Sequence, residues 1–402
     1  MNQYERWLDA GEAARRLGVK PATLYAYVSR GQLTRRRHAD GRRSLFDAAE
    51  IAALRDRTAG APNAAGGVTF TSAVTALGDD RPYFRGRDAL QLAGTTPYEQ
   101  VAEWLWAARE HDVGVPWGSR PDGVAVARAA QAALPDTALP LERLQVIVTT
   151  LAVTDAMRFN LAPDAVVATG RTLIAGMVDA LPQRARRKPA GSSIAARLWS
   201  KLTSAPADAA LLRVLDAALV LLADHELAAS TVAARVAASV KADPYAVVSA
   251  ALGVVTGPVH GGASLGAERM FAQMREPGDA VRVIGERLRA GERIPGVGHQ
   301  VYKSGDGRAT KLLELLHAVA PRHPRVAVAD ATRQELSSRG LPPVNADLAL
   351  ATLTGVCGMA PGSGEAVFAV ARTAGWLAHA MEEYHTSTPL RPRATYVGPA
   401  VT

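Results

Sequence analysis

The chain is poor in cysteine and in aromatic residues. Among 402 residues there is one cysteine, Cys357, and phenylalanine, tryptophan and tyrosine together make up 5%. A single thiol excludes an intramolecular disulfide and leaves no Cys/His spacing for a zinc site, so we expect no metal. Alanine and leucine dominate instead, and this composition favours helices over sheets. We therefore expect a mainly α-helical protein.

Long apolar runs are also missing. The first residues, MNQYERWLDAGEAARRL, contain no apolar segment of the kind found in signal peptides. The best uncharged stretch, Leu348 to Gly364, is interrupted by glycine and proline and is too short for a membrane span. Together with the single cysteine, these absences predict a cytoplasmic protein with no membrane contact.

Acidic residues are fewer than basic residues, most of all at the N-terminus. The formal net charge is +8, and residues 1–57 carry 12 lysine and arginine against 7 aspartate and glutamate residues, a net of +5. Such an excess permits contact with nucleic acid or with phosphate-bearing ligands. With 48% hydrophobic residues, the rest of the chain can bury a large core.

Residues 1–57 predict a small domain of their own. The sequence predicts four parts in order. They are a helix that ends at Leu17 before Gly18, a second helix that begins at Pro21, two strands around a His-Ala-Asp-Gly turn, and a helix capped by aspartate. This order resembles the winged helix-turn-helix of MerR and excisionase-like DNA-binding domains. The candidate nucleic-acid-binding residues are Tyr25, Arg30, Arg35, Arg36, Arg37, Arg42 and Arg43. The alternative is a basic appendage that packs on its own catalytic domain.

A small-residue stretch at 58–67 predicts a linker, and residues 68–402 predict one large helical body. Within this body, titratable residues stand beside glycine and proline in GPVHGGAS, IPGVGHQVYKSGDGRAT and LPPVNADLALATL. Glycine lets backbone approach a ligand closely. Each residue alone also has an ordinary explanation, such as Asp347 serving as a helix N-cap. A zinc HExxH motif fails because position 229 is alanine.

Taken together, six ordered phrases resemble the citrate synthases, including the 2-methylcitrate synthases. They are ADHELAASTVAARV, GPVHGGAS, PGVGHQVYKSGDGRA, VNADLALA, ARTAGWLAHAMEE and RPRATYVGP, and the resemblance spans about residues 68–402. It implies a two-lobed helical fold, with a large lobe of 68–262 and 372–402 and a small, closing lobe of about 263–371.

The resemblance also implies a reaction and its residues. Acetyl-CoA, a substrate and not a cofactor, would condense with oxaloacetate, with Asp347 as the base, His260 as donor to the thioester oxygen and His299 polarising the ketone. Oxaloacetate would be bound by His225, Arg308, Arg372 and Arg391, and Arg391 would reach into the site of a second subunit, which implies a homodimer. CoA would contact Pro295, Gly296, Val297, Gly298 and Lys303. No further cofactor is expected.

Two departures from the family pattern leave the acyl group open. Gln300 stands where the family usually has arginine, and NADL replaces the usual NVDF around Asp347. Propionyl-CoA, which would make the chain a 2-methylcitrate synthase, therefore remains the rival of acetyl-CoA. A third possibility is a DNA-binding regulator that uses the synthase body as a metabolite sensor.

Overall fold

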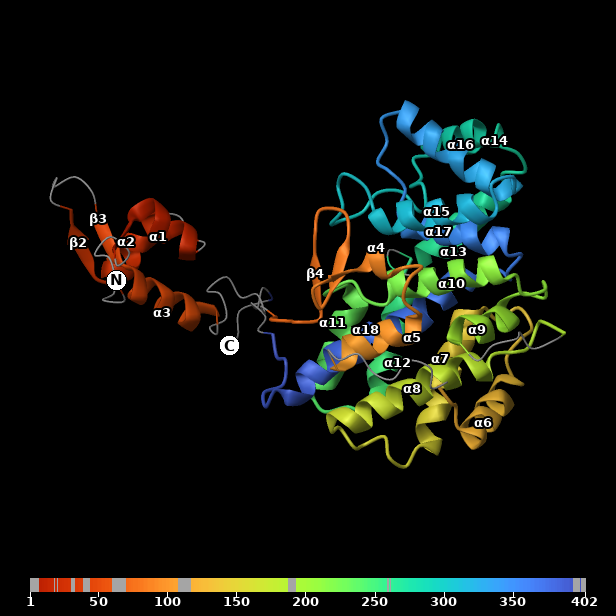
Figure 1. Cartoon of the computed structure of the whole chain (residues 1–402), viewed down its shortest axis with the longest axis horizontal. Helices are drawn as coiled ribbons and strands as arrows, with labels where there is room; N and C mark the ends of the chain where they lie inside the picture. The colour runs from red at the N-terminus through yellow and green to blue at the C-terminus, as the bar shows by residue number, and fades with distance from the viewer. Residues whose placement is uncertain are drawn as a thin grey trace. The chain divides into compact units, whose positions relative to one another are not determined.

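The computed structural model describes residues 7–17, 19, 21–29, 33–38, 44–59, 70–107, 117–186, 193–258, 260, 262–392 and 398. The chain divides into two compact units, one made of Met1–Thr71 with Arg391–Thr402 and one made of Ser72–Leu390. Figure 1 draws the elements of both units. The predicted boundaries of linker and lobes stay predictions.

The first unit is a three-stranded antiparallel sheet with three helices. The strand order is β1-β3-β2. Leu8, Leu24, Phe46 and Ile51 form the centre of its own small core. The elements are β1 Trp7–Asp9, α1 Ala10–Leu17, α2 Pro21–Ser29, β2 Arg35–Arg37, β3 Ser44–Asp47 and α3 Ala48–Ala59.

The helix signals of the first unit are confirmed, and one strand was missed. The helix after β3 is capped as expected, because the Asp47 carboxylate accepts the Ala49 backbone N–H at 2.8 Å. Strand β1 was not anticipated: three residues are too few to show an alternating pattern, and β1 exists because it pairs with β3. The predicted binding residues Arg30, Arg42 and Arg43 lie outside the described residues.

The second unit confirms the mainly helical prediction. Its small sheet, in the order β4-β5-β6, comprises β4 Thr75–Leu77, β5 Pro82–Phe84 and β6 Arg87–Asp88. The helices are α4 Ala89–Leu92, α5 Tyr98–Ala107, α6 Pro121–Gln131, α7 Pro140–Thr154, α8 Pro163–Ala180, α9 Ile194–Leu202, α10 Ala209–Leu222, α11 Ala229–Ser239, α12 Pro244–Val255, α13 Gly262–Ala272, α14 Asp279–Arg289, α15 Gly307–Val319, α16 Pro324–Ser338, α17 Ala346–Val356 and α18 Ser363–His385. In the described part of the chain, none combines the length and apolar character of a bilayer-spanning helix.

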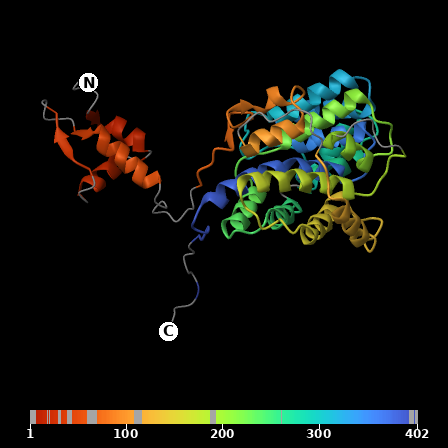
Figure 2. The same cartoon turned by 60° about the horizontal axis from the view of Figure 1, so that its bottom comes forward.

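Helix α18 is the axis of the second unit. Alanine, valine and leucine make most of its sides apolar, so it is buried along nearly its whole length. It packs against α5, α7, α8, α10, α11, α12, α13 and α17 (Figures 1 and 2). In Figure 1, helices α13 to α17 lie above the group formed by α5 to α12. Polar residues on α18 therefore face neighbouring helices rather than water.

Candidate active site

His225 lies in a buried polar cluster after the end of α10. Its Nε2 is 3.0 Å from the Tyr302 hydroxyl, and its ring meets the His299 ring edge-on with centroids 5.1 Å apart. Burial, followed by the nearby charges of Arg308 and Arg372, lowers the pKa of His225 well below its usual value. His225 is therefore a neutral ring at pH 7.

His299 is held by the backbone of the residues that follow it. Its Nδ1 is 3.1 Å from the backbone N of Val301 and 3.1 Å from that of Tyr302. Because a backbone N–H can only donate, Nδ1 accepts, and the neutral ring carries its proton on Nε2. Burial and the charge of Arg308 lower its pKa to about 4, so the ring is neutral at pH 7.

The Nε2–H of His299 points toward a second donor. Nη2 of Arg308 is 3.4 Å away, which makes this a contact between two N–H groups. A carbonyl or carboxylate oxygen placed beside both would accept from each. Arg308 itself is buried and pairs with Asp306 through Nε at 2.9 Å and Nη2 at 2.8 Å.

Asp306 joins the starts of two helices. It caps α15 by accepting the Arg308 backbone N–H at 3.1 Å, and its other oxygen accepts the Ala346 backbone N–H at 3.0 Å. Ala346 is the first residue of α17 and immediately precedes Asp347. The position of Asp347 is thereby tied to that of Arg308.

Asp347 lies in the first turn of α17 but does not cap it. Asn345 is the N-cap and accepts the Asp347 backbone N–H at 3.0 Å. Among the described residues, no donor is hydrogen-bonded to the Asp347 carboxylate. Burial raises its pKa to about 7, although the charges of Arg308 and Arg372 oppose the rise. Such a carboxylate can take a proton near neutral pH.

His260 lies between α12 and α13 and is oriented by Ser230. Its Nε2 is 3.3 Å from the Ser230 backbone N and 2.9 Å from Ser230 Oγ. The backbone N–H requires Nε2 to accept, so the neutral ring carries its proton on Nδ1. Burial, with a smaller effect of Arg372, lowers its pKa to about 4. His260 therefore presents a neutral Nδ1–H donor at pH 7.

Arg372, on α18, is a buried cation that makes no direct ion pair within the described residues, although the nearby charge of Asp224 stabilises it. Its Nε donates to the Leu222 carbonyl at 2.8 Å, and its guanidinium carbon lies 4.5 Å from the Phe368 ring centroid. Within the described residues, no carboxylate stands at ion-pair distance from it. Burial lowers its pKa to about 10. Because an unpaired buried charge is costly, this arginine is suited to receive an anionic ligand.

The predicted CoA loop is fastened to the segment that precedes Asp347. Asn345 donates its backbone N–H to the Gly296 carbonyl at 2.9 Å and its side-chain amide to the Gly298 carbonyl at 2.8 Å. Gly296 has a φ of 76°, and a Cβ there would lie 2.6 Å from Cβ of Leu348, so only glycine fits. Val297 forms a bridge with Val344. Pro295 completes the loop.

The remaining predicted residues lie further out. Lys303 is exposed, and its Nζ is 3.3 Å from the His299 carbonyl oxygen. Arg391 is exposed and begins the segment that belongs to the first unit, so the second unit does not contain it. The second unit holds the other six residues predicted for catalysis and oxaloacetate binding.

A stripe on α18 supports the site, and sequence reasoning missed most of it. Arg372, Trp376, His379 and Glu383 recur at intervals of four, three and four residues, so they share one helix face. Trp376 Nε1 donates to Ser230 Oγ at 3.2 Å, directly behind His260. This spacing of polar residues in an otherwise apolar helix is the signal that could have revealed them.

The C-terminal half of this stripe, His379 and Glu383, belongs to a buried network of charged and polar groups. His379 Nε2 is 3.3 Å from Oδ2 of Asp224, the residue before His225, and His379 Nδ1 is 3.0 Å from Nη1 of Arg235. Arg235 in turn pairs with Glu383 at 2.6 Å. This network fixes the chain on both sides of His225 to α18.

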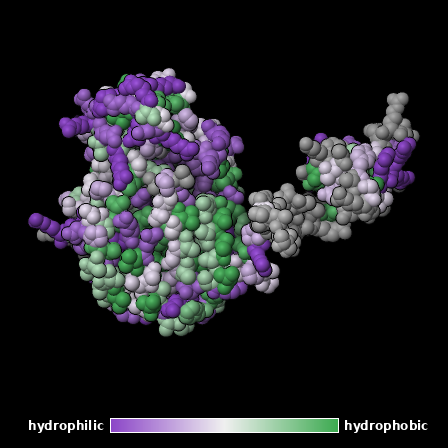
Figure 3. All heavy atoms as spheres, turned by 180° about the vertical axis from the view of Figure 1, so that it is seen from behind, coloured by the Kyte–Doolittle hydropathy of each residue, from purple (hydrophilic) through white to green (hydrophobic). Residues whose placement is uncertain are grey.

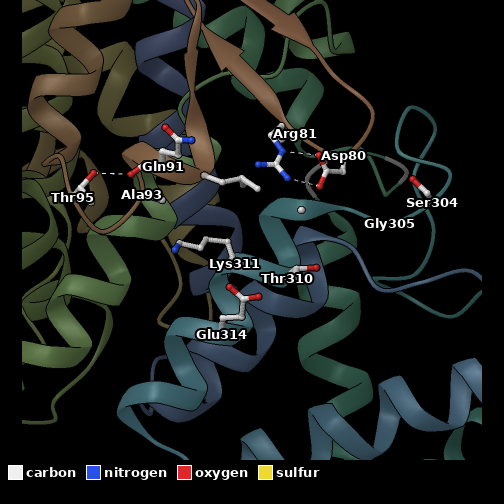
Figure 4. Close-up of a pocket in the computed structure, with 12 residues that line it drawn as sticks. Asp80, Arg81, Gln91, Ala93, Thr95, Ser304, Gly305, Thr310, Lys311 and Glu314 are labelled. Carbon is white, nitrogen blue, oxygen red and sulfur yellow. Dashed lines mark hydrogen bonds and ion pairs between the residues drawn. The ribbon is translucent and has the colours of Figure 1, made fainter.

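A cavity of about 740 Å³ lies beside the segment that follows His299. Figure 4 shows it between Asp80 and Arg81 of the β4–β5 turn, Gln91 of α4, and Lys311 of α15. The Asp80 carbonyl accepts the Gly307 backbone N–H at 2.8 Å, which fastens the turn to the start of α15. None of the predicted catalytic residues lines this cavity.

Fold and site together define a helical enzyme with histidines and a basic carboxylate near helix ends and with buried arginines on α15 and α18. Residues 63–393 match the family described as "Citrate synthase, C-terminal domain", and residues 7–58 match a helix-turn-helix domain. The chain belongs to the citrate synthase family of enzymes.

Named relatives agree with this assignment. "Citrate synthase 2" of Bacillus subtilis is 29% identical over 83% of this chain and 95% of its own length. "2-methylcitrate synthase 2" of Corynebacterium glutamicum is 30% identical over 66% of this chain and 73% of its own length.

The fold is that of solved citrate synthases. The crystal structure from Thermotoga maritima has a TM-score of 0.68 at 23% identity and covers 85% of this chain and 97% of its own. A ternary complex of the Thermoplasma acidophilum enzyme with carboxymethyl coenzyme A and oxaloacetate has a TM-score of 0.69 at 22% identity, over 86% of this chain and 97% of its own.

Proposed function

We propose that the chain condenses a short acyl-CoA with oxaloacetate and releases free CoA. The related enzymes of B. subtilis and C. glutamicum are named for reactions of this kind, and the neighbouring ternary complex holds a CoA analogue and oxaloacetate. The chain's own residues supply a base, two oriented hydrogen-bond donors and cations for carboxylates.

The first step is removal of a proton from the carbon next to the thioester. Asp347 is the base, and its pKa of about 7 suits proton transfer at neutral pH. The charge that develops on the thioester oxygen is stabilised by the Nδ1–H of His260. The observation that carries the proposal is the pair of Ser230 contacts to Nε2, since they leave His260 as a fixed donor before substrate arrives.

The second step is attack of the enolate on the ketone of oxaloacetate. The Nε2–H of His299 polarises the ketone and gives its proton to the new alkoxide, after which the thioester is hydrolysed. Arg372 binds one carboxylate, and Arg308 and His225 bind the other polar end. In a dimer, Arg391 adds a cation from the partner.

A CoA-release assay tests this function. The full chain with oxaloacetate and either acetyl-CoA or propionyl-CoA is expected to liberate CoA well above the rate without oxaloacetate. Absence of oxaloacetate-dependent release with both thioesters would remove the proposal. Asp347→Ala serves as the control for chemistry that does not use the site.

We favour acetyl-CoA and keep propionyl-CoA as the competing substrate. Ala346 and Leu348, which flank the base, are both smaller than the family's aromatic residue, so this part of the site does not separate the two acyl groups; Leu348 is fully buried against Gly296 of the loop. One methylene group gives only about 1–3 kcal/mol of discrimination. The ratio of kcat/KM for the two thioesters decides between them.

A homodimer is part of the proposal. Figure 3 shows apolar side chains gathered over the lower part of the second unit, whereas its upper part is hydrophilic. Val153 near the end of α7, Met157 and Phe159 between α7 and α8, and Val240 after α11 are each more than half exposed. Exposed apolar residues in such number favour a protein partner, and a second copy is the one we propose. Sedimentation equilibrium measures the oligomeric state.

The first unit supports a second function, binding of DNA. Two observations support this function. The first unit matches a helix-turn-helix family, and its strand β2 is exposed and basic, formed by Arg35, Arg36 and Arg37. Tyr25 on α2 is also exposed at 42%. A dimer would read paired half-sites. A mobility-shift assay on the chain's own upstream region tests this, and binding that is sensitive to salt but indifferent to sequence would contradict specific recognition.

A further inference from the structure

A second pocket, of about 670 Å³, lies where the ends of α6, α8 and α9 meet the start of α7. Its lining includes four basic residues, Arg128, Arg143, Arg186 and Lys201, and no aspartate or glutamate. None of the residues assigned to catalysis, oxaloacetate or CoA lines it. The pocket is therefore a basic site separate from the active site.

Arg128 and Arg143 are oriented by backbone carbonyls. Arg128 Nη2 donates to the Asp179 carbonyl at 2.8 Å, and Arg143 donates to the carbonyls of Ala138 at 3.3 Å and Pro135 at 3.0 Å. Within the part of the chain that the structure describes, no carboxylate lies at ion-pair distance from Arg128, Arg143 or Arg186. Backbone carbonyls orient Arg128 and Arg143 but do not neutralise them.

Other arginines of the same helices are paired, which sets this pocket apart. Arg171 on α8 pairs with Glu103, and Arg197 on α9 pairs with Asp179. The arginines at the pocket are left charged although carboxylates are available nearby. Like charges that lie close together repel one another. The clustering of these arginines without carboxylates therefore needs another source of negative charge.

Capping of α8 accounts for only part of the cluster. Arg128 and Lys201 donate to the last carbonyls of α8, where cations stabilise a helix end. Arg143 donates only to the loop before α7, and the structure gives Arg186 no partner among the described residues. A helix cap does not require these two arginines.

The pocket wall also contains an unused acceptor. Gln131 is 5% exposed, and its Nε2 donates to the carbonyls of Ala127 at 2.9 Å and Ala180 at 3.0 Å. These two bonds fix the amide orientation, and Oε1 is buried without any donor. Because Oε1 is covered in this structure, a ligand hydroxyl or amino group reaches it only when the Gln131 side chain shifts toward the pocket.

We propose that this pocket binds a small phosphorylated metabolite that also carries hydroxyl groups, such as a sugar phosphate or a nucleotide. Arginine and lysine recognise phosphate through charge-assisted hydrogen bonds. The volume suits a ligand of that size. Leu181 and Pro182 provide an apolar wall for the remainder of the ligand. This site is independent of the condensation reaction.

Isothermal titration of the full chain tests the proposal with ribose 5-phosphate, ADP, methyl phosphate and adenosine as probes. Arg186→Glu is the test variant, because Arg186 is exposed and has no hydrogen bond or ion pair with the described residues, so the fold is expected to survive. Arg213→Glu, an exposed arginine on α10 away from the pocket, changes the net charge equally. Condensation activity, which neither variant should alter, is measured in parallel.

The expected result is that ribose 5-phosphate or ADP binds to the parent, and that Arg186→Glu weakens this binding about tenfold or more while Arg213→Glu does not. The tighter of the two probes distinguishes a sugar phosphate from a nucleotide. Methyl phosphate lacks the hydroxyl groups and adenosine lacks the phosphate, so each should bind more weakly. Equal affinities in the two variants, tighter binding of adenosine, or no binding of any probe at millimolar concentration would overturn the proposal.

Discussion

Two buried arginines in contact with the same helix have opposite surroundings. Arg235 on α11 is 4% exposed and meets Glu382 and Glu383 of α18 at 2.7 and 2.6 Å. Arg372 on α18 is 1% exposed, and the described residues give it no carboxylate. Burial alone therefore does not tell the role of a cation. The arginine with two ion pairs holds helices together, whereas Arg372, which has no direct ion pair among the described residues, is the one we propose to bind an anionic ligand.

The same contrast holds for two carboxylates. Asp306 is buried among donors, and the guanidinium of Arg308 helps keep its pKa below the usual value despite burial. Asp347, in the first turn of α17, has no hydrogen-bonded donor among the described residues, and its pKa is raised to about 7. Asp306 organises the site, and Asp347 is left basic enough to remove a proton.

The largest effect is expected from Asp347→Asn. Removing the base while keeping its shape should lower kcat about 10³-fold, since general-base catalysis contributes about 10²–10⁴-fold. In the parent, kcat/KM should fall as the pH drops below about 7, where Asp347 becomes protonated. Steady-state CoA release over a range of pH measures both effects, and a variant as fast as the parent would remove Asp347 from the mechanism.

The next largest effect is the loss of stability in Arg235→Leu. Glu383 would be left buried without its partner, which typically costs about 3–5 kcal/mol of unfolding free energy. Urea denaturation of the parent and the variant measures this difference. A variant within experimental error of the parent would show that the network around His379 is not structural.

Asp347→Asn should also change stability in a pH-dependent way. The native state holds the Asp347 proton up to a pH of about 7 and the unfolded state only up to about 3.8, so the parent loses stability as the pH rises between these values. Asparagine has no such dependence. The variant should therefore gain about 2–3 kcal/mol over the parent between pH 5 and pH 8. A gain with the opposite sign would contradict the raised pKa.

The smallest effect is expected from Trp376→Phe. The indole N–H that supports Ser230 is lost while an aromatic ring remains, so one hydrogen bond of about 0.5–1.5 kcal/mol disappears. We expect kcat to fall about two- to tenfold with little change in KM for oxaloacetate, because His260 acts on the thioester. Trp199→Phe, a buried tryptophan remote from the site residues, is the matched control. Equal losses in the two variants would indicate a packing effect only.

Local signals in the sequence predict the elements better than the contacts between them. Pro21 and Asp47 marked the starts of α2 and α3 correctly, because a helix start is encoded within a few residues. Strand β1 was missed because it depends on β3, 35 or more residues later in the chain. Asp347 was recognised through its motif, but its neighbour Asn345, and not Asp347 itself, proved to be the cap.

The site was anticipated as a set of residues and not as a set of contacts. Motifs identified His225, His260 and His299, yet nothing local shows that Ser230 fixes the proton of His260 or that Trp376 supports Ser230. The basic pocket brings together residues from 128 to 201 through helix packing, which no single motif encodes. Tertiary packing supplies the partners that decide protonation and charge.

The central proposal is that Arg372 makes no direct ion pair among the described residues because it binds a carboxylate of oxaloacetate. Thermal unfolding with and without oxaloacetate tests it directly in the parent, in Arg372→Leu and in Arg213→Leu as the exposed control. We predict that saturating oxaloacetate raises Tm by several degrees in the parent and the control but not in Arg372→Leu. An equal shift in all three proteins, or no shift in the parent, would contradict the account.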